Sequence, residues 1–206
     1  MSSALVQGHG SNWSVGINPI DFDADYHAAI DWYGVPEELR ADIFDCTHDA
    51  VLNGAAASDL APFRARTSDL DTFKGWIGLP DAYIRSGKAI APPYDPARVY
   101  DHRFADPAAV LNDDESRDLL LAAGSYLFGD SAAVANYRCA IELRMAPFEI
   151  AVYAVRRLIL RPSSSLTIVG PPAVVIANRI ELHSGATITT QTVSRILSDH
   201  LVKIEV

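Results

Sequence analysis

Short pairs of aliphatic residues recur every six to eight positions in the last third of the chain. The two members of a pair stand two positions apart, so both side chains point to the same side of an extended strand. Corner-forming segments separate the pairs at 161–164, 170–172 and 183–185. The spacing therefore predicts a stack of short strands. The pairs are Leu158/Leu160, Leu166/Ile168, Val174/Ile176, Ile180/Leu182 and Ala186/Ile188.

Two architectures fit this spacing. One is a short β-solenoid, and the other is an antiparallel β-sandwich, whose strand pattern looks similar in sequence. A stack of few strands leaves open ends with free strand edges that must be covered. We therefore expect self-association, as a homo-oligomer, or a protein partner.

The preceding residues favour helices. Helices are predicted over 25–33 and 36–52, short ones near 68–76 and 81–86, and a longer one from 113 or 114 to about 129. In the segment 36–52, Pro36 suits a first helical position, and Leu39, Ile43, Cys46 and Ala50 follow the 3–4 spacing of one buried helical face. Residues 135–145 alternate apolar and polar side chains, which predicts a strand.

The predicted fold class is α+β, with a helical N-terminal part followed by a β-rich C-terminal part. The boundary is expected between 1–134, which is helical and acidic, and 135–206, which is β-rich, either as two domains or within one continuous domain. A chain of 206 residues is long enough to bury a core in both cases.

The net charge of −9 argues against non-specific binding of nucleic acid, because phosphate binding needs clustered Lys and Arg. The charge is unevenly placed: residues 1–134 carry −12 and residues 135–206 carry +3. Two surfaces of one protein are the simplest interpretation. The alternative is that the two halves attract each other, within one chain or between chains.

Targeting and cofactor signals are absent from the sequence. Cys46 and Cys139 do not make a disulfide framework, and no CxxC is present for a thiolate zinc site. The first residues lack a signal peptide, and no apolar run is long enough for a transmembrane helix. A cytoplasmic protein without a cofactor is the default expectation, and non-classical release is compatible with the same sequence.

Three side chains suggest acid–base chemistry. Asp45, His48 and Asp49 share one face of the predicted helix 36–52, at positions i, i+3 and i+4. Such a face could poise a general base or hold a metal. The alternative is an ordinary solvated face on which His48 relieves repulsion between two carboxylates, and we prefer this alternative.

Asp21, Asp23 and Asp25 belong to the densest acidic cluster, and alternate carboxylates suit a hard cation. The cluster fails the EF-hand pattern, because Tyr26 and Trp32 stand where a glycine and a terminal acid are required. An acidic helix start is common for electrostatic reasons alone. We expect capping and solvation there, with metal binding as the alternative.

Two further groups suit ligand or partner binding. Tyr94, Tyr100 and His102 lie in the proline-rich segment 88–107, and long ordered loops often carry function. His102 is also a candidate for proton transfer. Arg156, Arg157 and Arg161 form a small basic patch at the start of the aliphatic pairs, and arginine prefers carboxylate and phosphate partners.

No sequence motif identifies a reaction: GxSxG, GxGxxG, GxxxxGK[ST] and HExxH are all absent. The sequence favours a non-enzymatic binding or assembly protein that acts through its β-rich part and self-association. The alternative is a hydrolase acting on a carbohydrate or similar polar substrate, with carboxylates and His48 or His102 transferring the proton.

Overall fold

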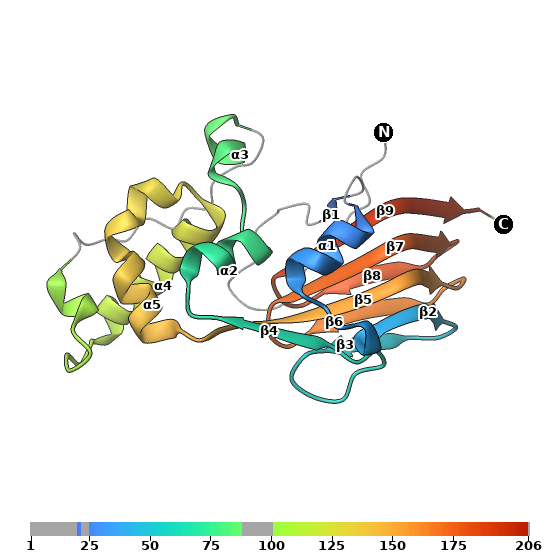
Figure 1. The fold of residues 1–206 in the computed structure, drawn as a ribbon, viewed down its shortest axis with the longest axis horizontal. Coiled ribbons are helices and arrows are strands. Elements are labelled where there is room, and N and C mark those ends of the chain that lie inside the picture. Colours follow the sequence, from blue (N-terminus) through green and yellow to red (C-terminus); the bar gives the residue numbers. More distant parts are fainter. Residues whose placement is uncertain (1–19, 22–24, 88–100, 206) are drawn as a thin grey trace. The chain divides into compact units, whose positions relative to one another are not determined.

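A computed structural model describes residues 20–21, 25–87 and 101–205. The chain divides into two compact units: one comprises Met1–Ala65 with Glu149–Val206, and the other is Arg66–Phe148. Strands near the N-terminus pair with strands near the C-terminus, so the first unit combines segments from both ends of the sequence. Figure 1 shows β2 in blue and β5 in orange within one sheet.

The first unit contains nearly all of the β-structure. Its elements are β1 (Ile20–Asp21), α1 (Tyr26–Tyr33), a 3-10 turn (Glu37–Leu39), β2 (Arg40–Cys46), β3 (Ala50–Asn53), β6 (Ser165–Val169), β7 (Ala173–His183), β8 (Thr187–Thr190) and β9 (Ser194–Ile204). Two strands, β4 (Phe63–Thr67) and β5 (Phe148–Leu160), extend across the boundary between the units.

Two parallel sheets form this unit. The larger sheet has the order β1-β9-β7-β5-β2, and each pair along it is parallel; β4 also pairs with β5. The smaller sheet has the parallel order β3-β6-β8. Neighbouring strands are joined in register, so that Ala50, Leu166 and Ile188 are successive partners across the smaller sheet.

The long strands of the larger sheet share an interruption at one position. In β5 the residues on both sides of Arg156 have register partners on the neighbouring strands, but Arg156 itself is skipped. The same gap occurs at Asp42 of β2, Asn178 of β7 and Asp199 of β9. Arg156 and Arg157 are both exposed, whereas Val155 and Leu158 are buried in the core. The alternation of inward and outward side chains therefore shifts by one residue at this level of every strand.

The core of the first unit lies between the sheets. Its rows are made of aliphatic side chains in register with one another, such as Leu158 with Ile180 and Leu166 with Ile188. Helix α1 packs on β7 and β9 and buries Ala29, Ile30 and Tyr33. Asp25 caps α1 through the backbone N–H groups of His27 and Ala28.

The second unit is mainly helical. It contains α2 (Leu70–Ile77), α3 (Asp81–Arg85), a 3-10 turn (His102–Ala105), α4 (Asp113–Phe128), a 3-10 segment (Ser131–Tyr137) and α5 (Arg138–Met145). Asn112 and Glu115 form a reciprocal capping box at the start of α4, which satisfies backbone donors that a helix start leaves free. None of the described helices is long and apolar enough to cross a membrane.

The fold-class prediction is wrong. Helices are interspersed among the strands rather than confined to an N-terminal part, since β2 and β3 follow α1, and α2 to α5 lie between β4 and β5. All strand pairs recorded in register are parallel, which excludes an antiparallel sandwich for the described residues. A regular solenoid is not formed either, because the second unit interrupts the succession of strands and strand length varies from 2 to 13 residues.

Two local predictions are also wrong. Residues 36–52 form a 3-10 turn and two strands instead of a helix, and residues 138–145 form helix α5 instead of a strand. In the second case Tyr137, Ala140 and Ile141 are buried, which is a helical spacing, while Cys139 is exposed.

Candidate binding surface

The acid–base cluster predicted on a helix does not exist as such. Asp45 lies in β2, and His48 and Asp49 lie in the short turn between β2 and β3. Asp49 accepts hydrogen bonds from the backbone N–H and the hydroxyl of Ser165, at 3.1 and 2.7 Å. The Nδ1 atom of His48 lies 2.9 Å from the hydroxyl of Thr47. The i, i+4 spacing that suggested a common face therefore has no structural counterpart.

Asp45 instead joins the basic patch. Its two carboxylate oxygens accept hydrogen bonds from Nε and Nη2 of Arg161, at 2.8 and 2.6 Å. This bidentate geometry is the strong form of the arginine–carboxylate pair. The hydrogen bonds from Arg161 hold the pKa of Asp45 below its ordinary value.

The predicted arginine patch is spread over rows with different partners. Arg156 lies at the interruption of β5, where its guanidinium is 3.9 Å from the carboxylate of Asp42. Arg157 lies one residue further, and its register partners on the neighbouring strands are Arg179 and, through Arg179, His200. We call Arg157, Arg179 and His200 the arginine row.

Glu181 is the shared partner of the two arginines in the arginine row. Its Oε1 atom accepts hydrogen bonds from Nη2 of Arg157 at 2.9 Å and from Nε of Arg179 at 2.8 Å. The Glu181 residue is 7% exposed, whereas the two arginine side chains are each 44% exposed. Burial raises the pKa of Glu181, but the two arginines outweigh it and hold the pKa below its ordinary value.

The other predicted residues are not brought together. Asp25 is engaged in capping α1. His102 is exposed in the 3-10 turn of the second unit, and Tyr94 and Tyr100 lie outside the described residues, as does Asp23. Asp21 belongs to β1, whose side chains are likewise not described. Among the residues that the structure does describe, no group of three or more His, Cys, Asp or Glu side chains could hold a metal.

The outer edges of β3 and β9 differ in whether their backbone groups have hydrogen-bond partners. At β3, Asp59 donates its backbone N–H to the carbonyl of Val51 at 3.0 Å and accepts the N–H of Val51 on its carboxylate at 2.7 Å. Ser58 Oγ accepts the N–H of Asn53 at 3.1 Å and donates to the Val51 carbonyl at 3.4 Å. The loop 54–62 thus satisfies the outer edge of β3.

No such cover is recorded for β9. β1 pairs with it only at Ile196 and Leu197, and within the described ranges no strand lies on the outer side of residues 198–204. No described strand pairs with the outer side of β8 either. Backbone N–H and C=O groups on a free edge are available to another chain.

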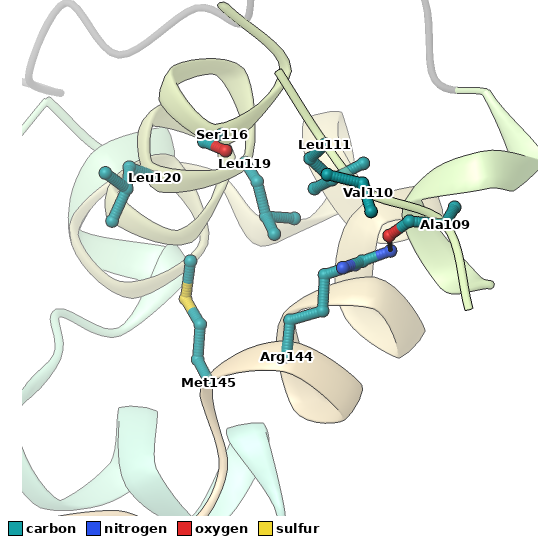
Figure 2. A pocket seen from close by; sticks show the side chains of 8 residues that line it. All are labelled: Ala109, Val110, Leu111, Ser116, Leu119, Leu120, Arg144 and Met145. Carbon is teal, nitrogen blue, oxygen red and sulfur yellow. Dashed lines mark hydrogen bonds between the residues drawn. The ribbon is translucent and has the colours of Figure 1, made fainter. Parts of the chain in front are cut away.

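The second unit carries a separate apolar hollow of about 400 Å³, shown in Figure 2. Leu119 and Leu120 of α4, Met145 of α5 and Val110 contribute to its lining. At its edge Arg144 donates hydrogen bonds to backbone carbonyls of the loop, among them Ala109 at 3.0 Å. The arginine therefore fixes the loop, and nothing in the structure indicates an occupant of the hollow.

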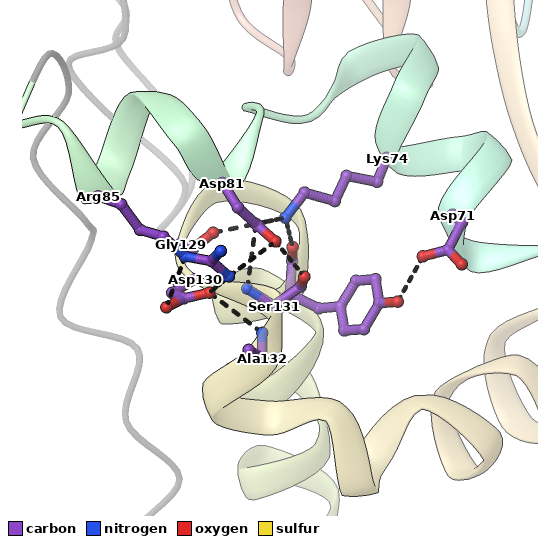
Figure 3. A network of polar contacts seen from close by, with 9 residues as sticks. Asp71, Lys74, Asp81, Arg85, Gly129, Asp130, Ser131 and Ala132 are labelled. Atoms are coloured by element: carbon purple, nitrogen blue, oxygen red, sulfur yellow. Dashed lines mark hydrogen bonds and ion pairs between the residues drawn. The ribbon is translucent and has the colours of Figure 1, made fainter.

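A polar network fastens the helices of the second unit to one another (Figure 3). Lys74 of α2 forms an ion pair with Asp81 of α3 and donates to the carbonyl of Tyr126 at 2.7 Å, near the end of α4. Ser131 Oγ donates to the same Asp81 carboxylate at 2.6 Å. Every close partner of Lys74 thus belongs to a helix or its end, which is a stabilising arrangement rather than a nucleophilic one.

Sequence reasoning missed Arg179, Glu181 and the covering loop 54–62. Arg179 and Glu181 were overlooked because they lie 22 and 24 residues from Arg157 and become neighbours only through parallel pairing. A usable signal was present: Arg157 and Arg179 occupy equivalent positions just before the aliphatic pairs Leu158/Leu160 and Ile180/Leu182.

No protein-family model, curated protein or solved structure matches the chain. The function must therefore be argued from the geometry alone.

The Lys74 network predicts that its ion pair contributes more to the unfolding free energy than the ion pairs of Arg85 do. The Lys74 and Asp81 side chains are 12% and 25% exposed, so Lys74→Met should leave a partly buried carboxylate with only Arg85, at 3.7 Å, as its cation. We expect a loss of about 2 kcal/mol in unfolding free energy. Arg85→Met removes the shorter pair with Asp130 and the longer one with Asp81, and because the Arg85 side chain is 57% exposed it should cost less than about 1 kcal/mol. Urea unfolding monitored by circular dichroism tests both, and equal losses would contradict the assigned role of Lys74.

The Asp45–Arg161 pair predicts a pH-dependent contribution to stability. Because the pKa of Asp45 is lowered in the folded state, the contribution is present above the unfolded pKa of about 3.9 and is lost as the pH falls through the folded value. Asp45→Asn should lower the unfolding free energy at pH ~7 by up to about 1 kcal/mol, and the difference from wild type should vanish well below pH ~3. Asp42→Asn is the control, because its carboxylate is 90% exposed.

Proposed function

We propose that the chain is a non-enzymatic binding and assembly protein whose β-unit joins a second copy through the free edge of β9. The supporting observation is the contrast between two outer strands: side chains of loop 54–62 satisfy β3, whereas no described strand pairs along the outer edge of residues 198–204 of β9. Burying a polar backbone requires hydrogen-bond partners, and a second strand supplies them in a row.

β1 limits where a second copy can pair. It occupies the edge at Ile196 and Leu197, so within the described residues the stretch of β9 without a paired strand runs from Ser198 to Ile204, with Leu201 at its centre. A two-fold dimer brings identical strands together antiparallel. Centred on Leu201, this arrangement places Leu201 against its own copy, while the carboxylate of Asp199 stays bonded to the backbone N–H of Tyr26 at the start of α1, at 2.7 Å.

The side chains of this stretch suit a specific contact. Leu201 is only partly buried and packs on the core, so a second copy would complete its burial. Lys203 is exposed and aligns with Leu182 on the neighbouring strand. A lysine on an edge disfavours indiscriminate strand pairing. The leucine pair at the centre would therefore carry the contact, with one Lys203 on each side of it.

The covered strand β3 argues for a closed dimer over a filament. Head-to-tail stacking would set the β8 and β9 end of one copy against the β2 and β3 end of the next, and repetition would give an open chain. The backbone of Val51 already has both its groups bonded to Asp59, so β3 offers little to an incoming strand. In a two-fold dimer β9 pairs with β9 of the second copy, so the bonded backbone of β3 is not involved.

The hydrolase alternative has no observation in its favour. Asp45 is held by Arg161, Asp49 by Ser165, and His48 contacts Thr47. Glu142 and Glu149, the other carboxylates near the β-region, bond to Arg138 and Arg64. These contacts are what a structural role requires, and they leave no poised acid–base pair among these groups.

Leu201→Lys tests the dimer. The substitution would set two lysines opposite each other at the centre of the pairing, and like charges directly opposite destabilise a strand pair, so we expect the dimer Kd to rise at least ~10-fold, which corresponds to about 1.4 kcal/mol. Circular dichroism checks that the monomer stays folded, since Leu201 is only partly buried. Sedimentation equilibrium measures the Kd, and Ile43→Lys on the opposite outer strand, where the side chain is 55% exposed, is the control. A monomeric wild-type chain would refute the proposal outright.

The covering loop predicts a change in the mode of assembly. Ser58→Ala combined with Asp59→Ala removes the side chains that bond to β3 and frees backbone groups of Val51 and Asn53. We expect species larger than a dimer in sedimentation velocity, with circular dichroism unchanged. Adding Leu201→Lys should reduce them, because head-to-tail contacts also use β9. A triple variant that assembles as extensively as the double one would assign the growth to another surface.

A further inference from the structure

We propose that Asn53 is a site of spontaneous deamidation and that this modification releases loop 54–62 from β3. Among the asparagines of the chain, Asn53 alone is followed by glycine. It is the last residue of β3, so the loop that covers the outer edge of this strand begins at the next residue. A chemical change at Asn53 therefore acts at the point where the strand and its cover are joined.

The reaction needs water and no other reactant. The backbone nitrogen of Gly54 loses its proton and attacks Cγ of the Asn53 carboxamide. A bond from this nitrogen to Cγ forms, the bond from Cγ to Nδ2 breaks, and the leaving group takes up the proton and departs as ammonia. Water then opens the resulting cyclic imide at either of its carbonyls. One product is aspartate, and the other is isoaspartate, in which the main chain runs through the former side-chain carbon.

The turn after β3 activates the Asn53 carboxamide. Its Oδ1 atom accepts hydrogen bonds from the backbone N–H groups of Ala55 at 2.9 Å and Ala56 at 3.3 Å. An asparagine that bonds to the backbone two residues later folds its side chain over its own turn. Attack on Cγ moves negative charge onto Oδ1, and the two N–H donors stabilise that charge as an oxyanion hole does.

The same turn supplies the nucleophile, the backbone nitrogen of Gly54. Within the described residues its N–H has no recorded acceptor, whereas the N–H groups of Asn53 and Ala55 are bonded. The two reacting groups border one small space, because a Cβ added at Gly170 would lie 2.8 Å from Asn53 Oδ1 and 3.4 Å from the Gly54 nitrogen. Glycine also has no side chain that would shield its nitrogen during the attack.

The packing of the loop keeps this reactive sequence in place. A Cβ at Gly54 would lie 2.5 Å from Cβ of Ala151 and 2.8 Å from Cγ of Pro171. A larger residue, which would slow the attack, therefore clashes with β5 and with the corner 170–172. The close approach that requires a glycine thus retains the Asn–Gly pair at the start of the covering loop.

Isoaspartate at residue 53 disrupts the cover of β3, because its extra main-chain carbon shifts the loop relative to the strand. Ser58 Oγ accepts the N–H of Asn53 at 3.1 Å, and Asp59 bonds to both backbone groups of Val51 at 2.7 and 3.0 Å. A displaced loop leaves these groups free on the outer edge. The modified chain should then form species larger than the dimer. This effect on assembly rests on the proposed function, whereas the modification itself does not.

Ageing of the full chain in mildly alkaline buffer tests the modification. Peptide mapping by mass spectrometry follows each asparagine, and an isoaspartate-specific methyltransferase labels the isoaspartate. We expect Asn53 to convert at least ~10-fold faster than every other asparagine, at a rate that rises with pH because the attacking nitrogen must lose its proton. The folded chain should react at least as fast as the chain unfolded in urea. Slower conversion in the folded chain would show that the turn protects the amide, and would overturn the proposal.

Asn53→Gln is the matched control, because its longer side chain must close a larger ring and reacts far more slowly. Circular dichroism checks that the fresh variant is folded, and sedimentation velocity compares fresh and aged samples of each chain. Aged wild type should contain larger species in proportion to its isoaspartate content, and aged Asn53→Gln should not. Deamidated wild type that sediments like the fresh chain would overturn the release of the loop. A fresh chain that is monomeric would refute the dimer alone, since the mass spectrum measures the modification independently.

Discussion

In-register parallel pairing is the constraint on which the β-unit depends. It stacks each side chain on the side chain at the same position of the next strand, so an inward row must be apolar in every strand that contributes to it. Leu158 with Ile180, and Leu166 with Ile188, meet this requirement. Outside the core the same pairing places polar residues of the same kind side by side, as with Arg157 and Arg179. Two neighbouring positive charges require a negative partner, and Glu181 supplies it.

The same constraint leaves strand edges at both ends of each sheet. A sheet that ends must either satisfy its last backbone groups or pair with another chain. The chain does the first at β3, where Ser58 and Asp59 substitute for a neighbouring strand. At β9 only Ile196 and Leu197 are paired on the outer side within the described part of the chain. The proposed dimer applies the second solution to β9, one of the described strands on which the first is missing.

The parts of the fold that depend on local chemistry could be predicted from sequence. The caps of α1, the corners that separate β5 to β8 and most of the aliphatic pairs fall where short-range rules place them. The segment 36–52 could not be predicted, because β2 shifts its inward alternation at Asp42 and Ile43. That shift leaves Leu39, Ile43, Cys46 and Ala50 at a spacing that imitates a helix, although the strand forms by pairing with β5 more than one hundred residues later. Non-local pairing of this kind overrides local propensity.

The candidate site could be predicted only in part from the sequence, for the same reason. Arg157 and Arg161 could be selected from their spacing along one strand, but Asp45 and Glu181 become their partners only through register. Register also gives β9 two kinds of surface, because its edge backbone and its outward side chains are different chemical groups. His200 belongs to the outer row, while Lys203 aligns with the inward Leu182 at the open edge. A dimer contact through the edge of β9 therefore uses groups other than those of the arginine row.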